Sequence, residues 1–272
     1  NQERGLSPEI RANLERQFGL NDPLYVQYFN YLKNILRGDF GPSYVSPNFT
    51  VTEKFANGLP VSVQLGMTAL ALALLVGGVL GIIAALNQNK AGDYTVIALA
   101  TAGSTIPTFV IAPIILIVFG LTLKWIPLGG WNNGAFINMV GPVLTLALPQ
   151  MAIVSRLMRG SMIESLRSHH IRTAKAMGLS DWSVVVKHAL RGALLPIVSY
   201  AGPAAAALLT GSVIVETIFA IPGVGREFVQ AALNRDYTVV MGTVVLIAVF
   251  TILFNLIVDV LYAFVDPRVR YD

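Results

Sequence analysis

Residues able to do covalent or metal chemistry are few in this sequence. The 272 residues include no cysteine, which excludes a disulfide framework, a thiolate metal site and a Cys nucleophile. No Gly-Lys dipeptide occurs, so there is no phosphate-binding P-loop. The three histidines, His169, His170 and His188, lie in one polar loop, and the adjacent pair cannot share a helix face. We therefore expect no catalytic residue, no metal site and no cofactor in this chain.

The loop that holds the histidines also holds most of the excess charge. Between Arg156 and Arg191 there are seven bases against two acids, a surplus of +5, whereas the whole chain has a net charge of +4. The bases are Arg156, Arg159, Arg167, Arg172, Lys175, Lys187 and Arg191. By the positive-inside rule this loop is cytoplasmic.

Within this loop the sequence predicts two helices joined at Gly178. The first runs over 161–177, with Ile171, Ala174 and Met177 on or near one side, and the second starts at Ser180 as its N-cap and runs through Leu190. Such a hairpin presents small and apolar side chains at its bend and suits insertion into a groove on a partner. A basic amphipathic hairpin resting on anionic lipid is the alternative, and the physics leaves both open.

The elements that position this loop are apolar helices. Hydrophobic residues make up 54% of the chain and charged residues 12%, about half the usual charged fraction, and the mean hydropathy is +0.64. These values exclude an ordinary soluble enzyme, a disordered chain and a nucleic-acid binder. Five charge-free stretches are long enough to span a bilayer: 62–86, 94–123, 135–154, 193–215 and 239–258.

The alternation of spans and loops predicts the topology and the division of the chain. We expect an external helical region over 1–60, a transmembrane domain over 61–265 with the cytoplasmic loop 156–192, and a cytoplasmic tail over 266–272. Segments 124–134 and 219–238 lie outside, and 87–93 lies inside. Five spans with an external N-terminus indicate one further helix upstream. Two helices are predicted in the external region, over 7–19 and 22–38; the second has an apolar stripe that packs on the membrane surface or on the spans.

The spans contain helix-breaking, small and polar residues. Pro107 and Pro113 predict kinks in the second span, and Gly77 with Gly81 permits close approach of two helices. Polar side chains either line a path or bond between helices, and we favour bonding for most; they are Gln64, Ser104, Thr105, Thr108, Gln150, Ser199, Tyr200, Thr210, Ser212 and Asn255. Glu216 and Asp259 stand near span ends, where we expect them to extend to the interface.

Several runs resemble the peptide permeases of ABC importers. The loop IRTAKAMGLSDWSVVVKHALRGALLP from Ile171 is similar to their EAA loop, and GSVIVETIFAIPGVG from Gly211, LNRDYTVV from Leu233 and VDVLYAFVDPRVR from Val258 are also similar. Upstream, LNDPLYVQYFNYLKNILRGDFGPSY from Leu20 and WIPLGGWNNGA from Trp125 resemble the B-subunit branch of oligopeptide importers. The resemblance covers nearly the whole chain. It departs from the general importer pattern at Arg172, where an acid is usual, and near Arg191, where a proline is usual.

The resemblance implies an all-α membrane protein with the type I importer-permease fold and six spans in the full protein. It implies transport of oligopeptides, coupled to ATPase subunits through residues 172–190. The implied partners are a second homologous permease subunit of the C type, two ATPase subunits of the D and F types that use ATP and Mg²⁺, an extracytoplasmic peptide-binding protein of the A type, and the lipid of a bacterial inner membrane. The implied coupling residues are Arg172, Ala174, Lys175, Met177, Gly178, Leu179 and Ser180.

Other sites and other functions stay open at this point. Gln64, Gln150 and Tyr200 are candidates for the substrate path, and Pro222, Gly223 and Gly225 for an external gate or a contact with the binding protein. Dipeptides, murein peptides or nickel are alternative substrates. A stand-alone secondary transporter or channel, and a membrane scaffold that transports nothing, are the rival classes.

Overall fold

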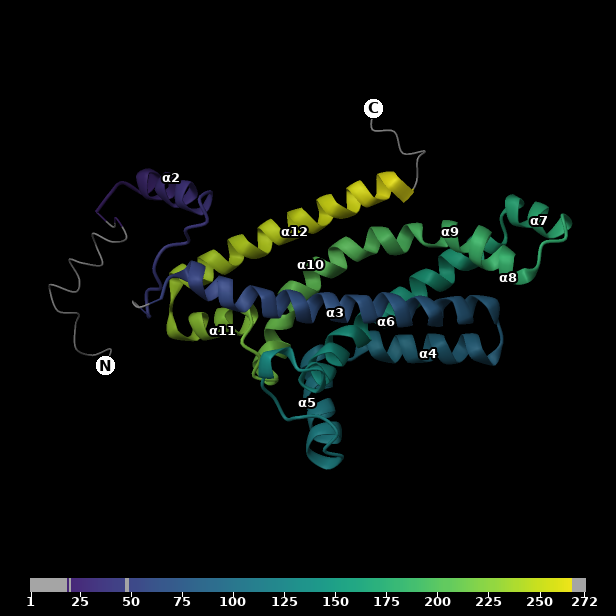
Figure 1. Ribbon diagram of the computed structural model, residues 1–272, viewed down its shortest axis with the longest axis horizontal. Helices are drawn as coiled ribbons and strands as arrows, with labels where there is room; N and C mark the ends of the chain where they lie inside the picture. Colours follow the sequence, from purple (N-terminus) through teal and green to yellow (C-terminus); the bar gives the residue numbers. More distant parts are fainter. Residues whose placement is uncertain (1–18, 20, 47–48, 266–272) are drawn as a thin grey trace.

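Long helices dominate the molecule. The computed structural model describes residues 19, 21–46 and 49–265. Four long helices, α3 (Val51–Leu86), α6 (Phe136–Leu166), α10 (Leu195–Ile218) and α12 (Tyr237–Val265), run along its length (Figure 1). Among the described residues the only extended pairing is an isolated bridge between Pro42 and Thr50. The all-α fold class is confirmed.

The number of possible spans agrees with the sequence. Three helices, α3, α6 and α12, are long and apolar enough to cross a membrane. Two bent pairs raise the number to five if each pair is one span: Ala91–Thr105 with Thr108–Thr122, and Asp181–Ala193 with Leu195–Leu209. Each of the five predicted stretches lies on one of these helices or pairs.

The first long helix begins earlier than predicted. It starts at Val51, eleven residues before the apolar stretch at 62. Thr50 and Glu53 form a capping box, in which the Thr50 hydroxyl accepts from Glu53 N at 3.1 Å and Glu53 Oε2 accepts from Thr50 N at 2.8 Å. Polar residues in the first turns hide this part of the helix from a count of apolar residues. Helix α3 therefore crosses the boundary that we placed at residue 60.

The second predicted span, 94–123, is broken rather than continuous. Helix α4 (Ala91–Thr105) and helix α5 (Thr108–Ile115) meet at a bend of 101°. Pro107 lies at the break, and Ile106 before it is extended, as a residue preceding proline prefers. Helix α5 continues into the π-helix η1 (Leu116–Thr122). The kink predicted at Pro107 is present, and it turns α5 sideways out of the bundle (Figure 1).

The predicted single helix over 161–177 is wrong. Helix α6 continues to Leu166, and a separate helix α7 (His169–Ala176) follows. Ser168 between them has an extended backbone (ψ 158°), and its hydroxyl donates to Ser165 O at 2.6 Å. A serine that bonds locally in this way ends one helix and starts the next.

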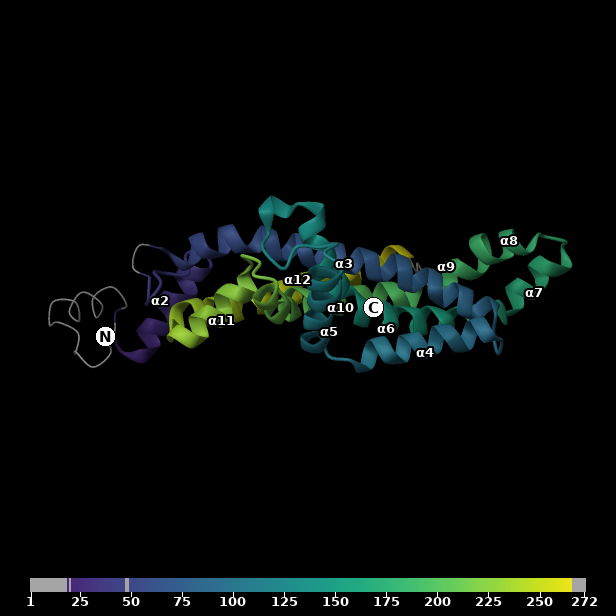
Figure 2. The ribbon, with the colours of Figure 1, turned by 90° about the horizontal axis from the view of Figure 1, so that it is seen from below.

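Glycines on α3 permit a close contact with a second helix. A Cβ added at Gly77 would lie 2.8 Å from Met151 O, and one added at Gly81 would lie 2.6 Å from both Ser155 O and Met158 Cβ. The predicted close approach is confirmed, and α6 is the partner. Helix α4 lies beside this pair in both ribbon views (Figures 1 and 2).

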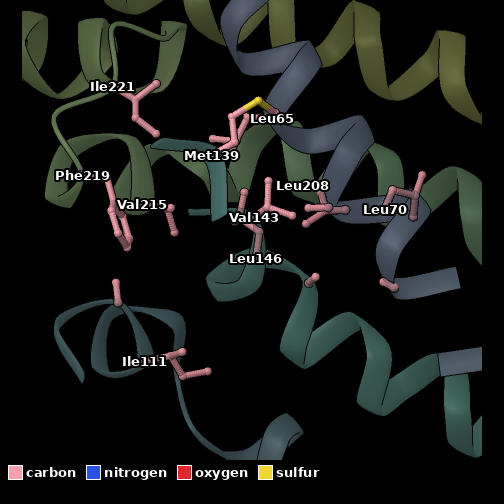
Figure 3. Packing of buried hydrophobic residues seen from close by; sticks show 14 of the residues in the cluster. Leu65, Leu70, Ile111, Met139, Val143, Leu146, Leu208, Val215, Phe219 and Ile221 are labelled. Carbon is pink, nitrogen blue, oxygen red and sulfur yellow. The ribbon is translucent and has the colours of Figure 1, made fainter. Parts of the chain in front are cut away.

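Buried apolar side chains form three clusters along the molecule. The largest lies where α3, α5, α6 and α10 meet, and Figure 3 shows Leu65, Leu146 and Leu208 gathered there. A second cluster surrounds Met158 and Met162 at the end that holds α7. A third, around Val51, joins α3, α12 and α11 (Val224–Asn234) at the opposite end.

The region that we predict to be external, 1–60, is only partly described. Helix α2 (Leu24–Ile35) lies within the predicted helix 22–38, and the turn after it ends at Gly38. Its apolar stripe is not packed on the spans, since Tyr25 is 67% exposed and Phe29 64%. The membrane surface remains the predicted partner of this stripe. The predicted helix 7–19 and the tail 266–272 fall, apart from Gly19, outside the described residues.

Substituting Gly81 by Ala should destabilise the protein. Alanine favours a helix over glycine by about 1 kcal/mol, but its Cβ would meet the backbone and side chain of α6 at 2.6 Å. We expect the melting temperature of the purified chain in detergent to fall by several degrees. Gly160→Ala is the matched control, because nothing lies within 4 Å of a Cβ there; an equal change in both variants would contradict the packing argument.

Candidate functional site

The polar loop forms a helical hairpin at one end of the molecule. Its first arm is α7, and its second arm consists of α8 (Asp181–Ser183), the π-helix η3 (Val184–Ala189) and α9 (Leu190–Ala193) (Figure 1). Ile171 and Val184 are each 1% exposed and pack with Met162. The hydroxyls of Ser165 and Ser161, on α6, donate to Ala189 O at 2.7 Å and to Ala193 O at 2.9 Å. The hairpin therefore rests on α6 through a buried, hydrogen-bonded base.

The bend has the predicted turn chemistry. Gly178 has φ 77°, where a side chain costs about 1 kcal/mol, and Leu179 N donates to Ala174 O at 3.3 Å. Ser180 caps the second arm by accepting from Ser183 N at 3.4 Å. A glycine that ends one helix and a serine that starts the next are both confirmed.

The candidate coupling residues separate into two groups. Ala174 is 6% exposed and packs into the base, whereas Met177 is 76% and Leu179 40% exposed at the bend. Arg172, Lys175, Gly178 and Ser180 are also exposed. Trp182, 77% exposed, adds an aromatic side chain that the candidate set did not include. The free surface of the hairpin is therefore an apolar tip bordered by bases.

A groove lies between the hairpin and α3. Its volume is about 750 Å³, and its apolar walls come from Val79 and Ile83 on one side and from Trp182, Val185 and Leu190 on the other. Lys175 and Asp181 stand at its edge, with Nζ and Oδ1 3.9 Å apart. Exposed pairs of this kind contribute little to stability.

A buried ion pair joins two helices near the same end. Asp93, in the first turn of α4, is 1% exposed. The guanidinium of Arg159, on α6, donates to it through Nε at 2.5 Å and Nη2 at 2.7 Å, and Asn89 N donates at 2.8 Å. Sequence reasoning missed this pair. The available signal was an acid directly before a charge-free span, at the end of the molecule where bases are in excess.

Two of the three candidate path residues meet in the interior. Tyr200, on α10, donates a short hydrogen bond to Oε1 of Gln150, on α6. Gln64 lies elsewhere: it is exposed, and its amide contacts Met139 Sδ at 3.6 Å. Bonding between helices is thus confirmed for Gln150 and Tyr200.

Other polar side chains in the spans bond within their own helix, which corrects our expectation for them. The hydroxyls of Ser104 and Thr105 both donate to Thr101 O, at 3.1 and 2.7 Å, and that of Ser199 donates to Leu195 O at 3.1 Å. A hydroxyl one turn away from a carbonyl reaches it without help from a second helix.

At the opposite end, Glu216 contradicts the expectation that it extends to the interface. It is 0% exposed. Its Oε1 accepts from the hydroxyls of Ser62 and Ser212, both at 2.7 Å, and its Oε2 accepts from Arg226 N at 3.0 Å. A carboxylate with this set of donors can stay buried. Asp259, by contrast, is exposed.

The three candidate external residues surround this carboxylate unequally. Gly223 and Gly225 are buried, and a Cβ at Gly223 would lie 2.3 Å from Glu216 Oε2. Pro222 is exposed and lines a hollow of about 250 Å³ with Lys54 and Glu227, whose charged groups lie 3.2 Å apart.

A second acid joins the segment before α3 to the start of α12. Asp236 is 2% exposed and accepts from the Ser43 hydroxyl, from Tyr44 N at 3.0 Å and from the Thr238 hydroxyl at 2.9 Å. Burial alone raises the pKa of Asp236, but the hydrogen bonds from Ser43, Thr238 and the amides of Tyr44 and Val239 outweigh it and lower the pKa below its usual value.

Comparison with known proteins decides the family. Residues 77–271 match the family described as "Binding-protein-dependent transport system inner membrane component". Across 269 residues, 99% of this chain and 88% of the relative, the chain is 48% identical to the oligopeptide transport system permease protein OppB of Haemophilus influenzae. It is 50% identical to OppB of Salmonella typhimurium over the same shares. The chain belongs to the family of binding-protein-dependent transport system inner membrane components.

Relatives that are named for a different substrate are also similar to this chain. The dipeptide transport system permease protein DppB of Bacillus subtilis is 46% identical over 99% of this chain and 87% of that protein. As a binding-protein-dependent inner-membrane component, the chain is a permease subunit of the inner membrane.

Solved structures confirm the fold of this permease. A chain of the MetNI methionine ABC transporter, in an inward-facing form, aligns with a TM-score of 0.66 at 16% identity, covering 78% of this chain and 96% of that one. A chain of an amino acid ABC transporter solved with histidines aligns with a TM-score of 0.61 at 19% identity, covering 78% and 94%. The importer-permease fold is therefore present.

Removing either partner of the buried ion pair should destabilise the permease. An unpaired buried charge costs about 3–5 kcal/mol, and since the Arg159 side chain is 24% exposed we expect losses near the lower value. The double variant Asp93→Ala/Arg159→Ala should lose clearly less than the sum of the two single variants. Melting temperatures in detergent measure all three, and additive losses would show that the pair does not interact.

The contact made by Asp236 should weaken in acid. Because its pKa is lower in the folded protein than in the unfolded chain, the contribution is complete above about pH 4 and is lost as the pH falls through the folded value. Asp236→Asn should lower the melting temperature at pH 7, and the difference from wild type should shrink as the pH falls below about 4. A difference that is constant with pH would mean that the carboxylate charge is irrelevant.

Proposed function

We propose that this permease is the B-type transmembrane subunit of an ATP-binding-cassette importer that moves oligopeptides into the cell. The observation that supports it best is the hairpin: a firmly based pair of short helices that exposes an apolar tip, with Met177 and Trp182 76% and 77% exposed. An apolar tip on a rigid support suits insertion into a cleft of another protein. The relatives named as oligopeptide permeases support the choice of substrate.

The hairpin would transmit movement from ATPase subunits to the spans. The partners hold the ATP and Mg²⁺, and this chain supplies the mechanical connection. A force on the bend passes into α6 through Ser161, Ser165 and the buried base. It then passes into α3 across Gly77 and Gly81, where the helices are too close to slide independently. We propose Arg172, Lys175, Met177, Leu179 and Ser180 as the contacts with the ATPase, with Gly178 forming the bend and Ala174 anchoring it.

A second homologous permease subunit would complete the path. Gln150 and Tyr200 are uncharged polar groups on α6 and α10, which suits contacts with peptide backbone, and the exposed Gln64 can serve the same purpose from α3. At the outer end, the exposed Pro222 can meet an extracytoplasmic peptide-binding protein. The buried Gly223 and Gly225 belong to the gate rather than to that contact.

Reconstitution tests the function and its rivals together. The complete importer, formed with the second permease, two ATPases and the binding protein, should take up peptides of several residues only when ATP is present. This chain alone in vesicles should give no flux. Flux from the chain alone would indicate a secondary transporter or channel, and no flux in any assembly would indicate a scaffold.

The dipeptide permease relative supports a second candidate substrate. At 46% identity to DppB of Bacillus subtilis, a dipeptide importer is the alternative. Competition of labelled oligopeptide uptake by dipeptides, murein peptides and Ni²⁺ separates these substrates; complete competition by dipeptides alone would reject the oligopeptide assignment.

Gly178→Arg should abolish ATP-dependent uptake while the protein stays in the membrane. Arginine both strains the left-handed bend and places a large charged group at the tip, whereas Gly178→Asn keeps the bend, because asparagine tolerates positive φ. We expect Asn to retain most of the uptake and Arg to lose it together with ATPase association. Uptake at the wild-type rate by Gly178→Arg would contradict the proposed coupling role of this bend.

A further inference from the structure

Helix α11 is bounded at both ends by strained residues. Ala220, before the helix, has φ 52°, and Arg235, at its C-cap, has φ 60°. A residue with a Cβ costs about 1–2 kcal/mol in this region, which glycine occupies freely. Such strain persists only where surrounding contacts hold it, and it is concentrated in segments that switch conformation.

The contacts that hold α11 converge on one carboxylate. Glu216, on α10, accepts from Arg226 N in the first turn of α11, and it also accepts from the hydroxyl of Ser62, on α3. That hydroxyl in turn accepts from Val224 N at 2.9 Å. One carboxylate and one hydroxyl therefore satisfy two of the free amides at the start of α11, and the negative charge lies where the helix dipole favours it.

Glycines make this arrangement tight enough to exclude water. Gly223 and Gly225 bring the chain so close that added Cβ atoms would lie 2.3 Å from Glu216 Oε2 and 2.6 Å from Val213 Cα. Away from the first turn, the outer side of α11 is open, with Leu233 74% exposed. The helix is thus pinned at its first turn and free on its outer side.

We propose that Glu216 is a positioning residue of the transport cycle, holding α11 against α3 and α10 until its hydrogen bonds to Ser62 on α3 and to α11 are released. The inference rests on the proposed importer function. Release lets Ala220 and Arg235 relax, which offsets part of the cost of breaking the bonds. The hydrogen bonds of Glu216 favour a closed position of α11, and the strain at Ala220 and Arg235 favours an open one.

The opposed contributions predict opposite effects of two substitutions. Glu216→Gln keeps the shape but removes the charge that strengthens the bonds, so the open position becomes more populated. Ala220→Gly removes the strain, so the closed position becomes more populated. A purely structural role for Glu216 predicts the same two directions for the exposure of α11, but it gives no reason for Ala220→Gly to slow peptide uptake, so uptake separates the two roles.

Thiol labelling in the assembled importer measures the two positions. Because the chain has no cysteine, Val224→Cys introduces a single thiol in this subunit, at the first residue of α11, which is 6% exposed. A membrane-impermeant thiol reagent should modify it about tenfold faster with Glu216→Gln or Ser62→Ala. It should react about fivefold more slowly with Ala220→Gly. Leu233→Cys, on the open side of the same helix, should react at one rate in all backgrounds.

The same labelling assay provides a control variant and the results that would contradict the inference. Thr145→Ala removes a buried hydroxyl that bonds only within α6, to Gly141 O at 2.8 Å, and should leave Val224→Cys labelling unchanged. A wild-type labelling rate with Glu216→Gln, or shifts of the same sign with Glu216→Gln and Ala220→Gly, would overturn the inference.

Uptake separates this inference from the proposed function. In vesicles that take up peptide, Ala220→Gly should slow uptake about fivefold without changing the KM for peptide. Unchanged uptake beside slower labelling would place the movement of α11 outside the transport cycle and overturn the inference. If the wild-type importer moves no peptide while labelling shifts as expected, the substrate assignment fails and the role of Glu216 in holding α11 stands.

Discussion

A carboxylate removed from water needs donors from the protein, and this requirement shapes both ends of the permease. Asp93, Glu216 and Asp236 are each at most 2% exposed, and each stands within or next to the terminal turn of an apolar helix. Each is surrounded by donors from a different part of the chain: a guanidinium on α6, a hydroxyl on α3 and an amide of α11, and a hydroxyl and amides from residues 43–45. Hydrophobic contact alone is non-directional, so these acids fix which segments meet at the ends of the apolar helices.

Between the two ends of the molecule, small residues determine which helices pack closely against one another. Helices in lipid gain little from apolar contact with one another, so close approach determines which pairs are firm. Gly77 and Gly81 bring α3 against α6, and Gly202 places α10 against Val258 of α12. The firm pair α3–α6 reaches the hairpin base at one end and the Ser62–Glu216 contact at the other. Only 11% of the most apolar stretch of α12 is buried, so this helix stands largely apart from the pair.

The sequence predicted what depends on composition and local chemistry. Long runs without charge located the spans, and Gly178 with Ser180 located the hairpin bend, because these signals are carried by adjacent residues. The capping box at Thr50 was also readable, but apolar counting overlooked it. The sequence could not show that Arg159 meets Asp93 or that Glu216 meets Ser62, because 66 and 154 residues separate the partners and only the packed bundle brings them together. The expectation that Glu216 extends to the interface was wrong for the same reason. The free-energy cost of burying its side chain depends on hydrogen-bond donors that other helices supply.

The buried and paired groups change how the excess of bases between Arg156 and Arg191 is interpreted. The surplus of +5 predicts the orientation of the loop, but two of its bases are paired: Arg159 with the buried Asp93, and Lys175 with Asp181 across the hairpin. What remains at the bend is apolar, with Met177 and Trp182 most exposed. Charge in this chain therefore has two separate uses. The exposed bases predict the orientation of the chain by the positive-inside rule, whereas the paired groups hold helices against one another. The surface at the bend is formed by apolar side chains more than by charged ones.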